Sequence, residues 1–250
     1  IPVVSVDREE GLEIIELIKN DNKGIMDLFY NPDFVAHFSS RGPVSPFYMK
    51  PDIVAPGAYI NSTQNNASYN FTSGTSFAAP HVSGAAALLL QKNPELQNHE
   101  IKSLLLTTVQ PVTDAYGQKF SLHESGAGRL DIGNAYNAKL IINPPSFVIN
   151  LSTDHPTTKK QLDLKLMDGE LEEIEVRFEG PKFIEITHEM KEGKIEIELS
   201  VIGKKYGDYE GKIFINHEKI QYTIPVLIHH TKGSISINQE NEKLFFEINH

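Results

Sequence analysis

Residues 74–84 read Gly74-Thr-Ser-Phe-Ala-Ala-Pro-His-Val-Ser-Gly84, and the interpretation of the whole chain starts from this stretch. A loop rich in Asn, Ser and Thr precedes it and the small-residue apolar run 78–90 follows it, which predicts a helix that begins at or next to Ser76. The free N–H groups and partial positive charge of a helix N-terminus suit an oxyanion that forms beside a serine hydroxyl. Gly74 allows another backbone or a substrate to approach closely, and Pro80 is expected near the first turn, where a missing N–H costs least. For Ser76 taken alone, the alternative is a helix cap with no chemical role.

The whole string resembles the nucleophile motif of the subtilisin-like serine proteases (subtilases). That motif is Gly-Thr-Ser, a variable residue, Ala, another variable residue, then Pro-His-Val and a small residue before Gly. Phe77 stands where the family usually has Met. With so many fixed positions, the string is far more specific than a lone Gly-x-Ser-x-Gly. The resemblance implies that Ser76 is the acyl-forming nucleophile, that its own N–H contributes to the oxyanion hole, and that Gly74 and Thr75 support substrate and oxyanion binding.

Three further segments resemble subtilases. The segments His37-Phe-Ser-Ser-Arg-Gly-Pro43 and Lys50-Pro-Asp-Ile-Val-Ala-Pro-Gly57 are similar to those that precede the nucleophile motif. The segment Gly126-Ala-Gly-Arg-Leu-Asp131 is similar to the end of the catalytic domain. We expect Arg41 and Asp52 to tie loops together through charge-assisted hydrogen bonds rather than to touch substrate.

Hydrophobic periodicity predicts the elements around these motifs. Alternation over residues 1–6 and helical spacing over 12–18 predict a strand followed by a short amphipathic helix. Small or apolar residues all round the run 78–90 predict a helix that is buried on most sides, as at the centre of an α/β layer fold, and that ends near Asn93. A second helix is predicted with Asn98 as its cap.

A short strand is predicted at 53–55, and the small, polar residues 58–73 predict a loop. A glycan on Asn70 would obstruct substrate close to Ser76, so Asn61 and Asn66 are better acceptors. The sequence leaves open the use of all four triplets of the N-glycan acceptor form, which start at Asn61, Asn66, Asn70 and Asn150.

The pattern changes after Ile141, where Pro144-Pro145 marks a boundary. Short alternating runs separated by turns predict an antiparallel β-sandwich. Residues 206–213 and the Ile-Pro-Val at 224–226 resemble the fibronectin-III-like domains that follow subtilase catalytic domains. Residues 231–250 predict one further hairpin. The strands of the sandwich are predicted at 147–151, 162–166, 174–178, 183–187, 195–201, 213–216 and 220–228.

Composition excludes several classes of function. The 250 residues are 40% hydrophobic and 22% charged, an ordinary globular composition for one large domain or two smaller ones. A formal net charge of −10 argues against a nucleic acid or an anionic membrane as partner. No apolar run approaches the roughly 18 residues of a membrane-spanning helix. The absence of cysteine excludes disulfides, thiolate catalysis and zinc–thiolate sites without fixing the compartment.

The start of the chain resembles the end of another module. Residues 1–6, Ile-Pro-Val-Val-Ser-Val, are similar to the last part of the protease-associated domain that many large subtilases carry between their oxyanion-hole Asn and their Ser. We therefore expect the natural polypeptide to begin well upstream of Ile1. The resemblance places the Asp motif, the His motif and that Asn upstream as well, and none of them has a match in this chain.

The histidines of this chain do not supply a base for Ser76. His81 lies roughly 140° round the helix from Ser76, so we expect a structural, hydrogen-bonded histidine. His99 and His123 lie in no motif that resembles a triad. Adjacent strand residues face opposite sides, so His229 and His230 cannot bind one metal ion together. No metal ligand or cofactor is identified; Ca²⁺ follows from the family resemblance alone, and no oxygen-ligand loop supports it.

The predicted fold is a partial α/β subtilisin-like catalytic domain followed by a fibronectin-III-like antiparallel β-sandwich. The domains are predicted as the end of a protease-associated insert (1–30), the C-terminal part of the catalytic domain (31–139), the sandwich (140–230) and the start of a further β module or tail (231–250).

The predicted function is the nucleophile-bearing part of a secreted serine endopeptidase, extracellular or on the cell surface, that hydrolyses protein or peptide substrates through an acyl-enzyme on Ser76. Its partner is the upstream part of the same protease, and this chain alone is expected to be inactive. The alternative is a non-catalytic subtilase-like surface or adhesion protein. A weaker option is a sandwich that binds a partner or cell wall, but its many Lys and Glu and few aromatics favour a spacer or a brace.

Overall fold

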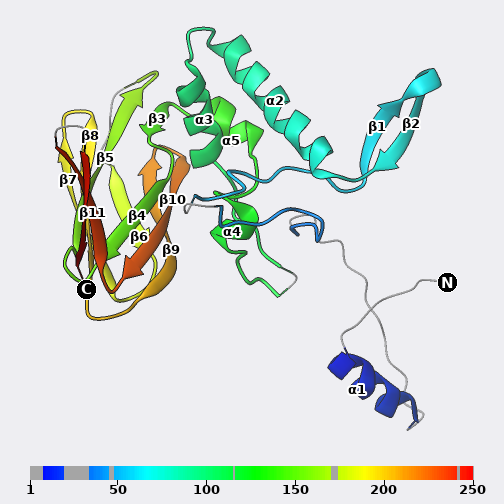
Figure 1. Cartoon of the computed structure of the whole chain (residues 1–250). Helices are drawn as coiled ribbons and strands as arrows, with labels where there is room; N and C mark the ends of the chain where they lie inside the picture. Colours follow the sequence, from blue (N-terminus) through cyan, green and yellow to red (C-terminus); the bar gives the residue numbers. More distant parts are fainter. Residues whose placement is uncertain are drawn as a thin grey trace. The chain divides into compact units, whose positions relative to one another are not determined.

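The computed structural model describes residues 8–19, 34–44, 48–114, 116–169, 174–240 and 243–249 (Figure 1). The chain divides into two compact units, Ile1–Pro32 and Asp33–His250. The element described in the first unit is α1 (Arg8–Lys19), which confirms the predicted amphipathic helix. The strand predicted at 1–6 lies outside the described residues.

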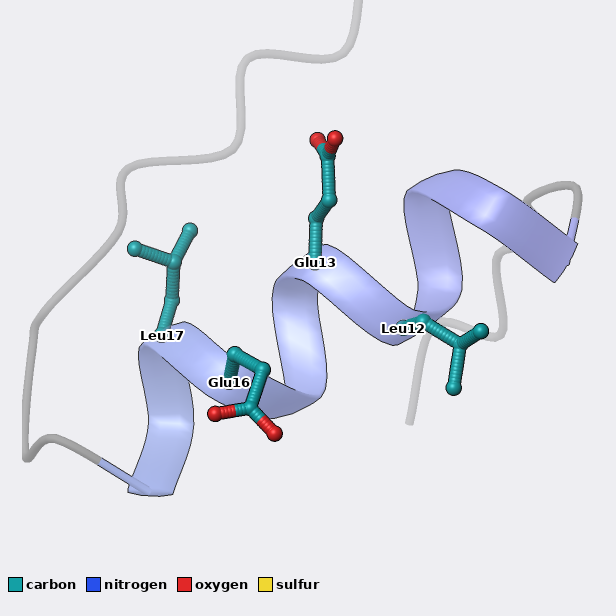
Figure 2. A pocket seen from close by; sticks show the side chains of 4 residues that line it. All are labelled: Leu12, Glu13, Glu16 and Leu17. Carbon is teal, nitrogen blue, oxygen red and sulfur yellow. The ribbon is translucent and has the colours of Figure 1, made fainter.

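An open hollow lies on the surface of α1. Figure 2 shows that Leu12, Glu13, Glu16 and Leu17, which line it, all project from this one helix. Because a single helix supplies all four side chains, the hollow does not gather groups from separate elements as a binding site would.

The helices described in the second unit are α2 (Thr75–Lys92), α3 (Asn98–Thr107), α4 (Leu122–Ser125) and α5 (Ile132–Asn137). α2 ends as predicted, at the C-cap Asn93, whose N–H donates to the Leu89 carbonyl. The predicted cap of α3 is wrong by one residue, because the N-cap is Gln97 and Asn98 is the first helical residue. The Gln97 N–H donates to the Glu100 carboxylate at 2.9 Å, as in a capping box. This contact fixes the start of the helix one residue earlier than predicted.

Residues 140–231 form a sandwich of two four-stranded sheets. One sheet has the order β3-β5-β8-β7 and the other β4-β10-β9-β6. All seven predicted strands are confirmed, and β3 is added before them. The strands are β3 (Leu140–Asn143), β4 (Phe147–Ser152), β5 (Thr157–Leu166), β6 (Glu175–Glu179), β7 (Ile184–Lys191), β8 (Lys194–Val201), β9 (Gly207–His217) and β10 (Ile220–Thr231).

The prediction of a wholly antiparallel sandwich is wrong for one pair of strands. β4 runs parallel to β10, with Phe147 opposite Val226, whereas the other pairs in these two sheets are antiparallel. Alternation along a strand shows which side chains face inward, but it does not show which strand lies alongside or in which direction it runs. The likeness to fibronectin-III domains stays a prediction.

One apolar core fills the sandwich and continues onto the helices. Many of the inward-facing side chains in both sheets are at most 1% exposed, and α3 contributes Leu104 to the same cluster. Burial of one such side chain contributes roughly 1.5–3 kcal/mol, so these layers hold the second unit together. The fully buried strand residues include Leu162, Ile195, Ile197, Ile213, Ile215, Ile224 and Ile228.

Buried polar contacts join α3 to the sandwich, and they join its two sheets to each other at the start of β3. The Ser103 hydroxyl on α3 donates to the Ile142 carbonyl at 2.6 Å and accepts from the Ile142 N–H at 3.2 Å. The Tyr222 hydroxyl on β10 accepts from the N–H groups of Leu140 at 3.1 Å and Lys139 at 3.3 Å. Burial of the fully enclosed Tyr222 ring raises the pKa of its hydroxyl. A buried polar group left without its partner is costly, so these contacts fix the joint.

Ion pairs and a capping carboxylate add to this joint. Glu100 on α3 pairs with Lys165 on β5 at 2.5 Å. Burial raises the pKa of Glu100, but the Gln97 N–H and the Lys165 ammonium outweigh that effect and hold the pKa below its ordinary value. The Glu210 carboxylate on β9 accepts from the Leu122 N–H at the start of α4, at 2.8 Å. The sandwich thus contacts two helices directly, as a brace would.

Two hairpins lie outside the sandwich sheets. The predicted loop at 58–73 is wrong: β1 (Ile60–Gln64) and β2 (Ser68–Thr72) pair antiparallel around a 3₁₀ turn, Asn65–Ala67 (Figure 1). β1 has Ile60 as its one apolar residue, and the two aromatic residues of β2, Tyr69 and Phe71, are exposed, so no buried face marks these strands in the sequence. β11 (Ser234–Glu240) and β12 (Lys243–Asn249) confirm the predicted last hairpin. Among the described residues, no helix is long and apolar enough to cross a membrane.

Candidate active site

Ser76 lies in the first turn of α2, on the surface. The N-cap is Gly74, so Thr75 and Ser76 are the first two helical residues, and both are exposed. The Gly74 carbonyl accepts from the Phe77 N–H at 3.0 Å. The Ser76 N–H is among the first-turn donors for which the helix supplies no carbonyl, so it is available to a ligand. The structure therefore brings the predicted residues Gly74, Thr75 and Ser76 together at one helix N-terminus.

The start of α2 rests on the end of the 50–57 segment. The Gly74 N–H donates to the Gly57 carbonyl at 2.7 Å. A Cβ at position 57 would lie 2.9 Å from the Gly74 carbonyl oxygen and 3.2 Å from the Ala78 Cβ. The sequence resemblance identified the 50–57 segment as one that precedes the nucleophile motif but did not predict this contact. The sequence features that hint at this contact are the Pro56-Gly57 pair and the glycine at position 74, which allow two backbone segments to come close together.

The 50–57 segment lies directly against the 126–131 segment. The Ala127 N–H donates to the Asp52 carbonyl at 3.0 Å, and Val54 bonds through its N–H to Gly128 at 3.0 Å and through its carbonyl to Leu130 at 2.8 Å. Gly126 has φ +59°, and a Cβ there would lie 2.4 Å from the Pro51 carbonyl oxygen. Only glycine allows this approach. The strand predicted at 53–55 is reduced to an isolated bridge between Val54 and Arg129.

Pro80 and His81 shape the helix just after Ser76. Pro80 is the sixth residue of α2, beyond the first turn where it was expected. It lacks the N–H that would bond to the Ser76 carbonyl in a regular helix. The His81 Nδ1–H donates to the Phe77 carbonyl at 2.8 Å, since a carbonyl can only accept. This contact confirms the prediction of a structural, hydrogen-bonded His81.

The loop-tying roles of Arg41 and Asp52 are confirmed. Arg41 pairs with Glu124 of α4 at 2.9 Å. Asp52 pairs with Lys50 at 2.7 Å and lies 3.5 Å from Lys102 of α3. These exposed pairs orient the loops around the site, but each contributes little to stability.

The expected burial of α2 is wrong for the described structure. Only Ala85 and Leu89 are buried, on the side that packs against the core, while Leu88 and Leu90 are 43% and 40% exposed. The sequence pattern was correct about apolar residues all round the helix. The described elements cover one of its sides, so the remaining apolar surface faces solvent here.

The other histidines belong to separate environments. His229 pairs with Asp208, and the His230 Nδ1–H donates to the Lys205 carbonyl. His230 is buried and His229 is half-buried, as expected for neighbours on opposite faces of β10. Within the described ranges, no three His, Asp or Glu side chains are grouped so that they could hold a metal ion.

Curated proteins that resemble this chain are named as proteases. The "Minor extracellular protease Vpr" of Bacillus subtilis (strain 168) is 26% identical over 253 residues, which cover 91% of this chain and 31% of that protein. The "Subtilisin-like protease SBT3.16" of Arabidopsis thaliana is 34% identical over 168 residues, or 62% of this chain and 22% of that protein. The "PII-type proteinase" of Lacticaseibacillus paracasei is 38% identical over 136 residues, or 48% of this chain and 7% of that protein. The chain thus spans less than a third of the length of these relatives.

Solved structures overlap only weakly with this chain. The endo-fucoidan hydrolase MfFcnA4 from glycoside hydrolase family 107 has a TM-score of 0.32 at 11% identity, over 42% of this chain and 15% of that one. A likeness at this level supports no argument about fold or function.

The family assignment rests on the N-terminal half of the chain. Residues 1–128, which include the stretch around Ser76 and the whole 50–57 segment that contacts the start of α2, match the Subtilase family (Peptidase_S8). The chain therefore belongs to the subtilase family.

Proposed function

We propose that this chain carries the nucleophile of a secreted subtilisin-like serine endopeptidase that acts on protein or peptide substrates. The observation that carries the proposal is the position of Ser76: it lies exposed in the first turn of α2, within the family's nucleophile motif. The names of the relatives support a protease, and the word "extracellular" in one of them supports a location outside the cell or at its surface.

In the proposed reaction the Ser76 Oγ bonds to the carbonyl carbon of the scissile peptide, and the hydroxyl proton passes to a histidine base. The C–N bond then breaks, and the leaving amine takes that proton. Water adds to the acyl-enzyme with the same base, which releases the acid and restores the serine. The first-turn N–H groups beside Ser76 stabilise the negative charge that develops on the substrate oxygen. No cofactor enters this reaction.

The base and its carboxylate partner are proposed to come from a part of the polypeptide outside these 250 residues. His81 is engaged with the Phe77 carbonyl of its own helix, which supports this part of the proposal. The same proposal assigns residues 1–30 to the end of a protease-associated insert and residues 140–230 to a fibronectin-III-like brace. Gly74 and Thr75 are proposed to support substrate and oxyanion binding beside Ser76.

Fluorophosphonate labelling read by intact mass tests the proposal. The full polypeptide that the gene encodes is expected to form one adduct that Ser76→Ala abolishes and Ser83→Ala, on the same helix, leaves intact. The 250-residue chain alone is expected to form none.

Two outcomes would overturn parts of the proposal. A full polypeptide that forms no Ser76-dependent adduct would favour the alternative of a non-catalytic subtilase-like surface protein. An adduct on the isolated 250-residue chain would show that a histidine within it activates Ser76.

A further inference from the structure

Gly57 is a close backbone neighbour of the helix start that carries Ser76. A Cβ at position 57 would lie 2.9 Å from the Gly74 carbonyl oxygen and 3.2 Å from the Ala78 Cβ. Gly74 lies before Ser76 and Ala78 lies after it, in the same turn of α2. The first distance is shorter than van der Waals contact allows, and the oxygen belongs to the backbone. A methyl group at position 57 therefore has to displace backbone on either side.

The two sides differ in how firmly they are held. The 52–54 backbone is held by three hydrogen bonds to residues 127–130, where Ala127 and Leu130 are 1% and 5% exposed. The first turn of α2 is exposed at Thr75 and Ser76, and its buried anchors lie further along the helix, at Ala85 and beyond. The helix start is the softer side, so it is the part that moves.

We infer that Gly57 is a positioning residue for Ser76. Because Gly57 has no side chain, the first turn of α2 can pack closely against it, and any side chain at position 57 displaces the nucleophile. This inference rests on the proposed function, since it assigns Gly57 a part in the acylation that Ser76 performs. Gly57 itself does not touch substrate. Its loss leaves the serine chemically intact but misplaced relative to its base and to the substrate carbonyl.

The misplacement acts mainly on the rate of acylation. A displacement of a few tenths of an ångström in a reacting group is enough to lower a rate by roughly tenfold, because reactivity falls steeply with misalignment. Gly74 and Thr75, which are proposed to support substrate and oxyanion binding, move with Ser76, but the oxyanion forms only in the transition state, so their displacement also acts on kcat. The expected signature is therefore a fall in kcat with little change in KM.

The test compares Gly57→Ala with Gly133→Ala in the full polypeptide that the gene encodes. Gly133 is an exposed residue of α5, where an added Cβ would meet only the Asp131 side chain, at 3.3 Å. The readouts are the rate of fluorophosphonate labelling, kcat and KM on a peptide substrate, and Tm. We expect Gly57→Ala to lose about tenfold or more in labelling rate and kcat, with KM within about twofold. Gly133→Ala should match wild type.

A double variant guards against misfolding. Ala78→Gly removes one of the two contacts, so Gly57→Ala/Ala78→Gly should recover part of the lost labelling rate even where Gly57→Ala folds poorly. A folded Gly57→Ala variant with the wild-type labelling rate overturns the inference, and so does a double variant that recovers nothing.

Failure of the proposed function gives a different result. If the wild-type polypeptide does not label at Ser76 at all, the position of Ser76 is compared between crystal structures of wild type and Gly57→Ala, superposed on residues 126–131. A shift of the first turn of α2 supports the positioning role of Gly57, and an unmoved turn overturns it.

Discussion

Helix α2 and the inner strands of the sandwich are built from the same kind of residue, but their surroundings differ. Leu162 on β5 is fully buried in the core that the two sheets share with α3, while Leu88 on α2 is 43% exposed. The sandwich contains both of its own sheets, so the apolar side chains that face inward pack against one another within the chain. α2 is packed on one side only, through Ala85 and Leu89. The core of the sandwich is therefore closed by its own two sheets and α3, whereas the described elements cover α2 on one side only.

The largest expected effect tests this contrast directly. Leu162→Ala should lower the free energy of unfolding of the chain by about 2–5 kcal/mol, because it leaves a cavity in a closed core. Leu88→Ala should change it by at most roughly 0.5 kcal/mol, as for an exposed position. Urea unfolding of both variants gives the two values.

The same two leucine variants can also contradict the difference in packing between α2 and the sandwich. Equal losses for Leu88→Ala and Leu162→Ala in this chain would mean that α2 is already packed on its outer side. In the full polypeptide, a cost of Leu88→Ala that rises towards that of Leu162→Ala would show that further sequence covers the helix.

A smaller effect is expected where the chain enters the sandwich, at the start of β3. Tyr222→Phe removes the acceptor of the Leu140 and Lys139 N–H groups and leaves the buried Leu140 N–H unsatisfied. A loss of about 1–3 kcal/mol in unfolding free energy is expected. Tyr69→Phe, at a 68% exposed hydroxyl-bearing ring on β2, is the matched control and should be neutral. Two variants of equal stability would show that the Tyr222 hydroxyl does not hold the start of β3.

The smallest effect concerns pH. The pKa of Glu100 is held below its ordinary 4.5 in the folded chain, so its ionised form stabilises the fold. This contribution is complete above about pH 4.5 and is lost as the pH falls through the lower folded value. Glu100→Gln should therefore be less stable than wild type at neutral pH, and the gap should narrow in acid. Exposed Glu95→Gln serves as the control in a pH series of urea unfolding, and a gap independent of pH would contradict the role of the carboxylate.

Hydrophobic periodicity predicted the regular elements well, because a buried face requires apolar residues at regular intervals in the sequence. The strand at 195–201 alternates Ile195, Ile197, Leu199 and Val201 inward, and the structure buries all four. The hairpin β1–β2 was missed for the same reason: Tyr69 and Phe71 face solvent, so no inward-facing set marks the strands. The parallel pairing of β4 with β10 depends on which strand is the neighbour, which alternation does not encode.

The site divides in a similar way. Ser76 and its two preceding residues stood out because a long motif surrounds them, and the structural role of His81 followed from its angle round the helix. The role of Gly57 did not follow, because it depends on a backbone approach between segments separated by a hairpin. The sequence shows that position 57 is a glycine, but it does not show that the Gly74 carbonyl oxygen lies close to it.

The pairing of β4 with β10 also bears on the order in which the chain folds. Residues 147–152 form an edge strand whose partner in the sheet is residues 226–231, near the end of the sandwich. Such a long-range pair forms only after the intervening chain has been ordered, which slows folding. β10 also carries Tyr222, whose hydroxyl holds Leu140 at the start of β3. During synthesis, α2 therefore emerges well before β10, the strand that completes this sheet.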